Sequence, residues 1–225
     1  MNTIITPNQW PMKSTLLTLV LLSISLYASA QNYLFEKGYS GFHIAGQWAR
    51  VDGSGILGIT LGNTWDGRLT LSVDGGRERA KRFDISSYSV KDITSYSVKP
   101  SVNYMVLKQS QGGMPLSLGL GASYQYNWFK NIDNLTVGTV AFDLGLFRRI
   151  YMEKKAALIP GAYIGWGESK TSYRPDPDPF KNSAVFGALQ TSILLNKFHI
   201  TPAVHFTKEI TSFHLQVGLI FPQPK

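Results

Sequence analysis

Two short clusters of residues combine groups that could carry out catalysis. His205, Thr207 and Glu209 place an imidazole, a hydroxyl and a carboxylate at alternate positions, which are the groups of a base-activated nucleophile. Threonine is a poor replacement for serine in such a site, and the spacing is loose. Asp176 and Asp178 supply paired carboxylates for acid–base chemistry, but the segment RPDPDPF around them holds no histidine partner. Glycine-rich phosphate loops, HExxH and EF-hand patterns are absent from the sequence. We therefore expect no enzymatic activity.

The histidines are the other residues with chemical potential. Two imidazoles held close together could share a metal ion, or repel one another when both become charged near pH 6. They could equally fill a polar interior and accept hydrogen bonds. A metal site built on them lacks a clear third ligand, because Glu209 is the only nearby carboxylate. The chain has no cysteine, so thiolate ligands and disulfides are excluded. We expect a packing role and neither metal nor cofactor for the four histidines, His43, His199, His205 and His214.

The elements that position these residues are β-strands. In the segment 116–128 (LSLGLGASYQYNW) every second residue is apolar or aromatic, and a period of two is typical of a strand with one apolar face. The segment is also long enough to cross a bilayer, which takes about 9–11 residues of a tilted strand. The same alternation recurs in nine other segments, 41–50, 55–63, 68–76, 96–107, 135–148, 156–167, 183–195, 198–207 and 212–221.

The polar face of these strands decides between a membrane barrel and a soluble one. In a soluble barrel this face would meet water and be rich in lysine and glutamate. Here it consists mainly of Gly, Ala, Ser, Thr, Asn and Gln, and its charged members are Arg68, Asp74, Lys99 and Asp143. We therefore predict an all-β, transmembrane, antiparallel up-and-down barrel of about ten strands, with eight or twelve as alternatives. The four charged residues and the four histidines are predicted to face its lumen.

The lumen charges have two interpretations. Asp74 faces Lys99 if the connection between their strands is symmetric, and buried opposite charges usually pair because an unpaired one is costly. The alternative is a ring of charges that selects ions. A ten-stranded barrel lies near the size at which side chains fill the interior, so we favour pairing.

Tryptophans provide a separate sign of a membrane. Trp48, Trp128 and Trp166 fall in the outward phase near the same end of their strands. Tryptophan favours the membrane–water boundary because its ring is apolar and its N–H needs a partner. We predict that the three form an interfacial girdle.

Residues 1–30 are predicted to be a cleaved signal peptide. Lys13 supplies a positive charge, Leu16–Tyr27 an apolar core, and Ala28-Ser29-Ala30 a cleavage site of small residues. The apolar core is too short for a membrane-spanning helix. Met12 is an alternative start.

The barrel domain is predicted to span residues 31–225, with Gln31 as the first mature residue. The chain is basic, with a formal charge of +8, yet it has neither a basic helix nor an aromatic–basic stacking motif. We therefore expect no nucleic acid, and expect lipopolysaccharide and anionic lipid headgroups as the partners of this charge.

The connections predict an orientation. Short turns and both termini fall on one side, and two long connections, residues 77–95 and 168–182, fall on the other, as in barrels with long external loops. The prolines of RPDPDPF are expected to prevent strand pairing there. The repeated octad in residues 86–101 (SSYSVKDI and TSYSVKPS) is expected to extend its loop as a hairpin.

In its predicted signal peptide, its glycine–aromatic alternation and its last strand, SFHLQVGLIF (Ser212–Phe221), the chain resembles the small porin-like outer-membrane β-barrel families of Gram-negative bacteria. The resemblance implies a place in the cell outer membrane and recognition of the terminal aromatic, Phe221, by the barrel-assembly machinery. Here Pro222–Lys225 follow that aromatic residue. The function we favour is a structural or interaction barrel whose external loops contact a protein partner. The alternatives are a narrow channel for ions or small solutes, and an accessory component of a secretion or conjugation apparatus.

Overall fold

A computed structural model describes residues 34–36, 38–51, 54–84, 89–109, 115–130, 132, 134–153, 156–173 and 176–223. The predicted signal peptide and its cleavage site lie outside these residues. Within them no helix is long and apolar enough to cross a membrane. The strands are β1 (Ser40–Val51), β2 (Ser54–Trp65), β3 (Leu69–Asp84), β4 (Ser89–Leu107), β5 (Ser117–Phe129), β6 (Leu135–Phe147), β7 (Ile150–Glu153), β8 (Ala156–Tyr173), β9 (Asp176–Leu195), β10 (Phe198–Thr207) and β11 (Thr211–Gln223).

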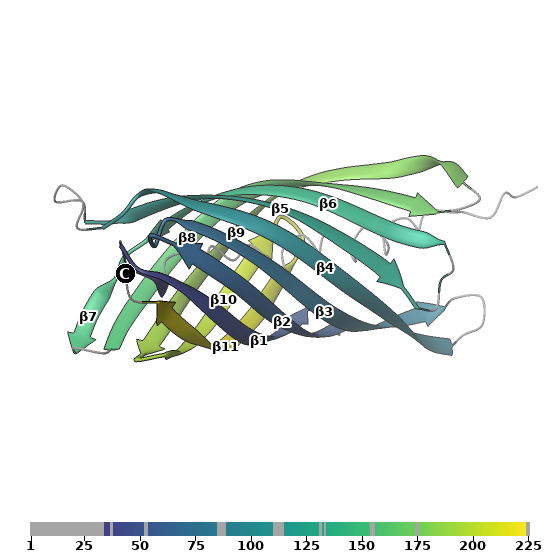
Figure 1. Ribbon diagram of the computed structural model, residues 1–225. Coiled ribbons are helices and arrows are strands. Elements are labelled where there is room, and N and C mark those ends of the chain that lie inside the picture. The colour runs from purple at the N-terminus through teal and green to yellow at the C-terminus, as the bar shows by residue number, and fades with distance from the viewer. Residues whose placement is uncertain are drawn as a thin grey trace, which may run out of the picture.

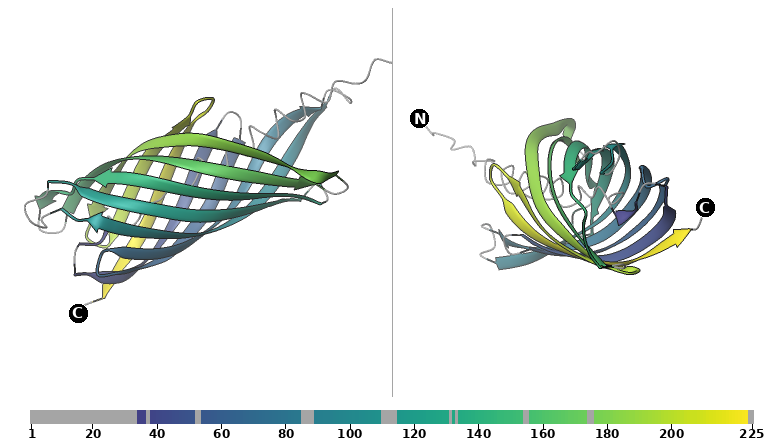
Figure 2. Two further views of the ribbon diagram at one scale, coloured as in Figure 1. Left: turned by 90° about the horizontal axis from the view of Figure 1, so that it is seen from above. Right: turned by 90° about the vertical axis from the view of Figure 1, so that its left-hand side faces the viewer.

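Among the described residues, ten strands form a closed antiparallel barrel. Each strand from β1 to β6 pairs with the next, β6 pairs with β8, and β8 to β11 again pair in order. The pairing of β1 with β11, from Ser40 opposite Gln223 to Arg50 opposite Phe213, closes the sheet. Figures 1 and 2 show the strands inclined around one axis. Closure satisfies the backbone hydrogen bonds of both edge strands. The predicted fold class and strand number are therefore confirmed.

The short strand β7 falls where a turn was expected. It follows β6 after a break at Arg148 and Arg149, and it pairs with the first residues of β8, with Ile150 opposite Leu158. It thus extends the line of β6 beyond the point where β6 itself pairs with β8. One strand more than predicted is present, but the closed ring still has ten.

The alternation of side chains sets the two faces of the barrel wall. On β5, Leu120 and Tyr124 are each 48% exposed on the outside, whereas Gln125 and Asn127 are 3% and 4% exposed on the inside. The same outward row of exposed apolar side chains occurs around the ring, with Leu57 reaching 65%. Such a continuous apolar outer surface is not compatible with water as the surrounding solvent. It matches the outer face of a membrane barrel.

Two hairpins are longer than predicted. β3, β4, β8 and β9 have 16, 19, 18 and 20 residues, while the other barrel strands have 10 to 13. Most of the predicted loops 77–95 and 168–182 is therefore strand, and both hairpins project at the end opposite the C-terminus (Figure 1). We call this the hairpin end, and the end with the first residue of β1 and the last of β11 the terminal end.

The prolines interrupt the ladder locally, although they do not keep the segment out of β9. This strand begins at Asp176 and contains Pro177 and Pro179. Asp176 lies opposite Tyr173 and Phe180 opposite Thr171, so the register passes over Pro177–Pro179 at an irregularity. The described part of the octad repeat runs along β4 as a single strand.

Arg68 lies outside the strand on which it was predicted. Asp66 and Gly67 have positive φ angles of 51° and 59°, which is the conformation of a two-residue hairpin turn with an Asp-Gly sequence. The amide of Arg68 donates to the carbonyl of Trp65 at 2.9 Å. Arg68 therefore completes this turn at the terminal end, with its guanidinium 3.9 Å from the Asp66 carboxylate.

Candidate functional site: a filled barrel lumen

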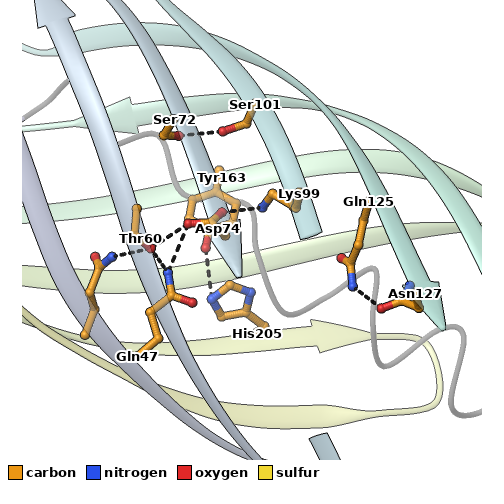
Figure 3. Close-up of polar contacts among 11 residues, drawn as sticks. Gln47, Thr60, Ser72, Asp74, Lys99, Ser101, Gln125, Asn127, Tyr163 and His205 are labelled. Carbon is orange, nitrogen blue, oxygen red and sulfur yellow. Dashed lines mark hydrogen bonds and ion pairs between the residues drawn. The ribbon is translucent and has the colours of Figure 1, made fainter. Parts of the chain in front are cut away.

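A layer of polar side chains crosses the middle of the lumen. Asp74 on β3 lies directly opposite Lys99 on β4, with 3.5 Å between its Oδ2 and the lysine Nζ. The hydroxyl of Thr60 donates to Asp74 Oδ1 at 2.5 Å, and the amide of Gln47 donates to the same oxygen at 3.3 Å (Figure 3). Asp74 and Lys99 are 1% and 2% exposed. The carboxylate is thus held by one cation from β4 and by two neutral donors, one from β1 and one from β2.

Asp143 on β6 approaches the same lysine from two strands further along the wall. It lines a cavity of about 10 Å³ together with Lys99, Gln125 and Phe186. Gly121, its cross-strand partner on β5, leaves the room for it, because a Cβ at that position would lie 2.6 Å from Asp143 Oδ1. Lys99 therefore has a second carboxylate nearby, in addition to its ion pair with Asp74.

The histidines occupy two separate levels. His205 and His214 face one another with ring centroids 4.0 Å apart. The hydroxyl of Tyr163 lies 3.0 Å from His205 Nε2, and that of Ser212 lies 2.9 Å from His214 Nε2. Their cavity has a volume of about 40 Å³, enough for very few water molecules. One nitrogen of each ring is thus engaged by a hydroxyl, as expected of polar side chains that fill a lumen.

His43 and His199 lie nearer the terminal end, and both are fully buried. Two glycines make room for them: a Cβ at Gly62 would lie 2.5 Å from His43 Nε2, and one at Gly218 would lie 2.6 Å from His199 Nε2. In the described part of the chain, no group of three or more His, Asp or Glu side chains is placed to hold a metal ion.

The residues considered for catalysis do not come together. His205 points into the lumen, whereas Glu209 is exposed in the turn between β10 and β11. The hydroxyl of Thr207 accepts from the amides of Glu209 and Ile210 at 3.3 and 3.1 Å, and so caps that turn. The side chains of Asp176 and Asp178 lie outside the described residues.

An apolar cluster that the sequence reasoning missed fills the lumen at the terminal end. Leu34 and Phe35, which precede β1, are 1% and 2% exposed inside the barrel. They pack in one buried cluster whose other members are Met105, Phe147, Ala157, Ile159, Leu194 and Ile220. A signal was present in the sequence, because Met105 and Phe147 are large apolar residues in the inward phase, next to outward apolar neighbours. A second buried cluster, which includes Val51, Ile56, Phe186 and Ile210, lies toward the hairpin end.

Polar contacts fasten residues 34–36 inside this end. Arg149 forms an ion pair with Glu36, with 2.9 Å between Nη1 and Oε1, and its Nη2 donates to the carbonyl of Leu34 at 2.5 Å. The amine of Lys108 donates to the carbonyls of Phe35 and Gly67. We call Leu34–Glu36, with these two basic residues, the terminal seal. It leaves a pocket of about 240 Å³ open beside Glu36 and Arg149.

Lys108 of the terminal seal should make the stability of the barrel depend on pH. Burial and, to a smaller extent, the nearby Arg149 guanidinium lower the pKa of the Lys108 amine to about 7, against the attraction of Asp66 and Glu36. The unfolded chain keeps an ordinary lysine pKa of about 10.4 and so binds more protons between these values. Stability should therefore rise from about pH 7 to pH 10 and fall as the pH is lowered again. The midpoint of urea unfolding in detergent micelles measures this, and Lys108→Met should flatten the rise. An equal rise in the variant would exclude Lys108 as its source.

The predicted girdle residues all face outward. Trp48, Trp128 and Trp166 are 41–42% exposed, and Trp166 stacks on Phe142 of β6 with ring centroids 6.5 Å apart. Trp166 is not at the end of its strand, however, because β8 continues to Tyr173. A girdle at one level stays a prediction. Phe221 also faces outward, beside Phe42 of β1 on the closing seam.

Solved structures of similar shape support the fold. No protein-family model matches the chain, and no curated protein matches its sequence. Among solved structures, the β domain of the Bordetella autotransporter BrkA is similar, with a TM-score of 0.53 and 11% identity, over 83% of this chain and 100% of that one. The transport unit of the autotransporter AIDA-I from Escherichia coli matches with a TM-score of 0.50 and 10% identity, over 93% and 98% of the two chains. The chain therefore has the fold of outer-membrane β-barrel proteins.

Proposed function

We propose that this protein is a non-conducting barrel of the cell outer membrane whose role is structural or interactive, with the hairpin end outside the cell. The filled lumen is the observation that carries the proposal. The terminal seal closes one end, the Asp74–Lys99 layer crosses the middle, and the cluster around Phe186 and Ile210 fills the space toward the other end. A route for ions or solutes would have to displace all three.

The hairpins supply the surface for an interaction. β3 pairs with β2 only as far as Arg79, and β4 pairs with β5 only from Ser95. The described segments 80–84 and 89–93 therefore pair with each other but extend beyond both neighbouring strands. Strand edges of this kind can accept an added strand from a partner protein. We therefore place the contact with a protein partner at these hairpins. The proposal assigns no catalytic role to the barrel.

Current measurement across a planar bilayer tests the proposal. The reconstituted barrel should show no unitary conductance steps, because the layers of the lumen are held by burial and hydrogen bonds. Leu34→Gly/Phe35→Gly with Arg149→Ala loosens the terminal seal alone and should also show no steps, because the Asp74–Lys99 layer and the cluster around Phe186 and Ile210 still fill the lumen. Steady steps from the unaltered protein would refute the non-conducting role and favour a narrow channel.

The orientation is tested separately. Protease added to intact cells should cut within residues 77–95 or 168–182, since these hairpins project furthest from the barrel (Figure 1). Cleavage there only after the outer membrane has been permeabilised would show that the hairpins face the periplasm.

A further inference from the structure

A groove of about 530 Å³ lies on the outer wall of the barrel, where β5, β6 and β8 run side by side. Gly138 on β6 provides the gap, because its cross-strand partners Tyr126 and Lys170 have side chains and it has none. The hydroxyl of Tyr124 lies over this gap, 2.9 Å from the position that a Cβ of Gly138 would take. The stacked rings of Phe142 and Trp166 form the other end of the groove.

The groove crosses the border of the apolar surface. Along the outward positions of β8, Ile164 and Trp166 are followed by Glu168 and Lys170. The outward positions of β9 change in the same way, from Val185 to Lys181. In a membrane barrel this change from apolar to charged residues, next to a tryptophan, marks the level of the lipid headgroups. One end of the groove thus faces acyl chains and the other faces headgroups.

Two like charges meet at the headgroup end. Lys170 and Lys181 lie directly opposite one another on β8 and β9, and both are exposed. Like charges at opposed positions of a sheet are unfavourable, so an anion between them would stabilise the pair. Among the described side chains, Glu168 is the acidic group nearest to the lysine pair along the strands. It lies one outward position closer to the apolar surface, opposite Ser183 and Val140.

We propose that this groove is a binding site for a phosphate-bearing lipid, namely lipid A of the outer leaflet. Its phosphate lies between Lys170 and Lys181, and an acyl chain lies along Phe142 and Trp166. A lipid fits because it combines two groups in one ligand. A phosphate can bind the cationic end of the groove, and an acyl chain can bind the aromatic end that lies within the apolar surface. The inference rests on the proposed orientation, with the hairpin end outside.

Native mass spectrometry of the folded, full-length barrel in non-ionic detergent tests the site, with purified bis-phosphorylated lipid A as the probe. Lys170→Gln/Lys181→Gln should weaken binding about 30-fold, because two lysines at a membrane surface together contribute about 2 kcal/mol and every 1.4 kcal/mol is a factor of ten. The control Lys197→Gln/Lys208→Gln removes the same charge from two exposed turn lysines and should bind like the unaltered protein. If both double variants lost lipid A binding equally, the loss would be due to net charge alone, and the proposed site would be wrong.

A second variant tests the groove without changing any charge. Gly138→Val fills the gap with a residue that strands favour, and it should also weaken lipid A binding. Inorganic phosphate at millimolar concentration should not displace the lipid, whereas displacement would show that the acyl chain contributes nothing. Unaltered binding by Gly138→Val, or by the Lys170/Lys181 variant, would overturn the proposal. These readouts are independent of conductance, so a conducting barrel would refute the proposed function and leave them interpretable.

Discussion

Phe147→Ala is expected to lower the free energy of unfolding of the barrel by about 3–5 kcal/mol, the usual cost of removing a buried phenylalanine ring. Phe147 is the last residue of β6, in the apolar cluster at the terminal end, and it is 2% exposed. Its ring covers two glycines, since a Cβ at Gly145 or Gly161 would lie within 2.7 Å of ring atoms. These two glycines supply no side chain to fill the vacated space. Equilibrium urea unfolding in detergent micelles or lipid vesicles measures the change.

Phe142→Ala is the matched control for this prediction. It removes the same ring from the same strand, but from the outer face, where Phe142 is 53% exposed. Lipid or detergent replaces the lost contacts there, so the cost should be clearly smaller. Equal destabilisation by the two substitutions would contradict the placement of Phe147 inside a packed lumen.

Lys99→Met is expected to destabilise the barrel by about 3–5 kcal/mol, because it leaves the Asp74 carboxylate buried without its cation. Asp74 keeps its bonds from Thr60 and Gln47, but these donors are neutral. The double variant Asp74→Asn/Lys99→Met removes both charges of the pair. It should recover part of the loss but not all of it, because Asp143 still lacks the lysine beside it. This recovery distinguishes a charge effect from a loss of packing.

A double-mutant cycle measures the coupling between the two residues. Urea unfolding of the unaltered protein, the two single variants and the double variant provides the four free energies. Additive losses in the double variant would show that the 3.5 Å contact contributes no coupling. A selectivity role would instead appear as altered ion selectivity with stability unchanged.

The sequence by itself determined the fold class. Alternation of apolar and polar residues is a local property, and one period of two is enough to define a strand and its two faces. Ten such segments, short turns such as Asp66-Gly67 and an uncharged inner face predicted a membrane barrel with the correct number of barrel strands. The lengths of the hairpins were underestimated because their polar residues resemble a loop, although the backbone continues to pair through the segment that follows Pro177 and Pro179.

Only the tertiary structure decided what fills the lumen. Leu34 and Phe35 precede the alternating region, and nothing in their own sequence indicates that they enter the barrel. Arg149 reaches Glu36 across 113 positions of the chain, and Lys108 reaches Phe35 across 73. Contacts of this kind depend on the stagger with which β1 meets β11, which is a property of the closed ring and not of any single strand. A local pattern specifies which way a side chain points, whereas closure specifies which other side chain it meets.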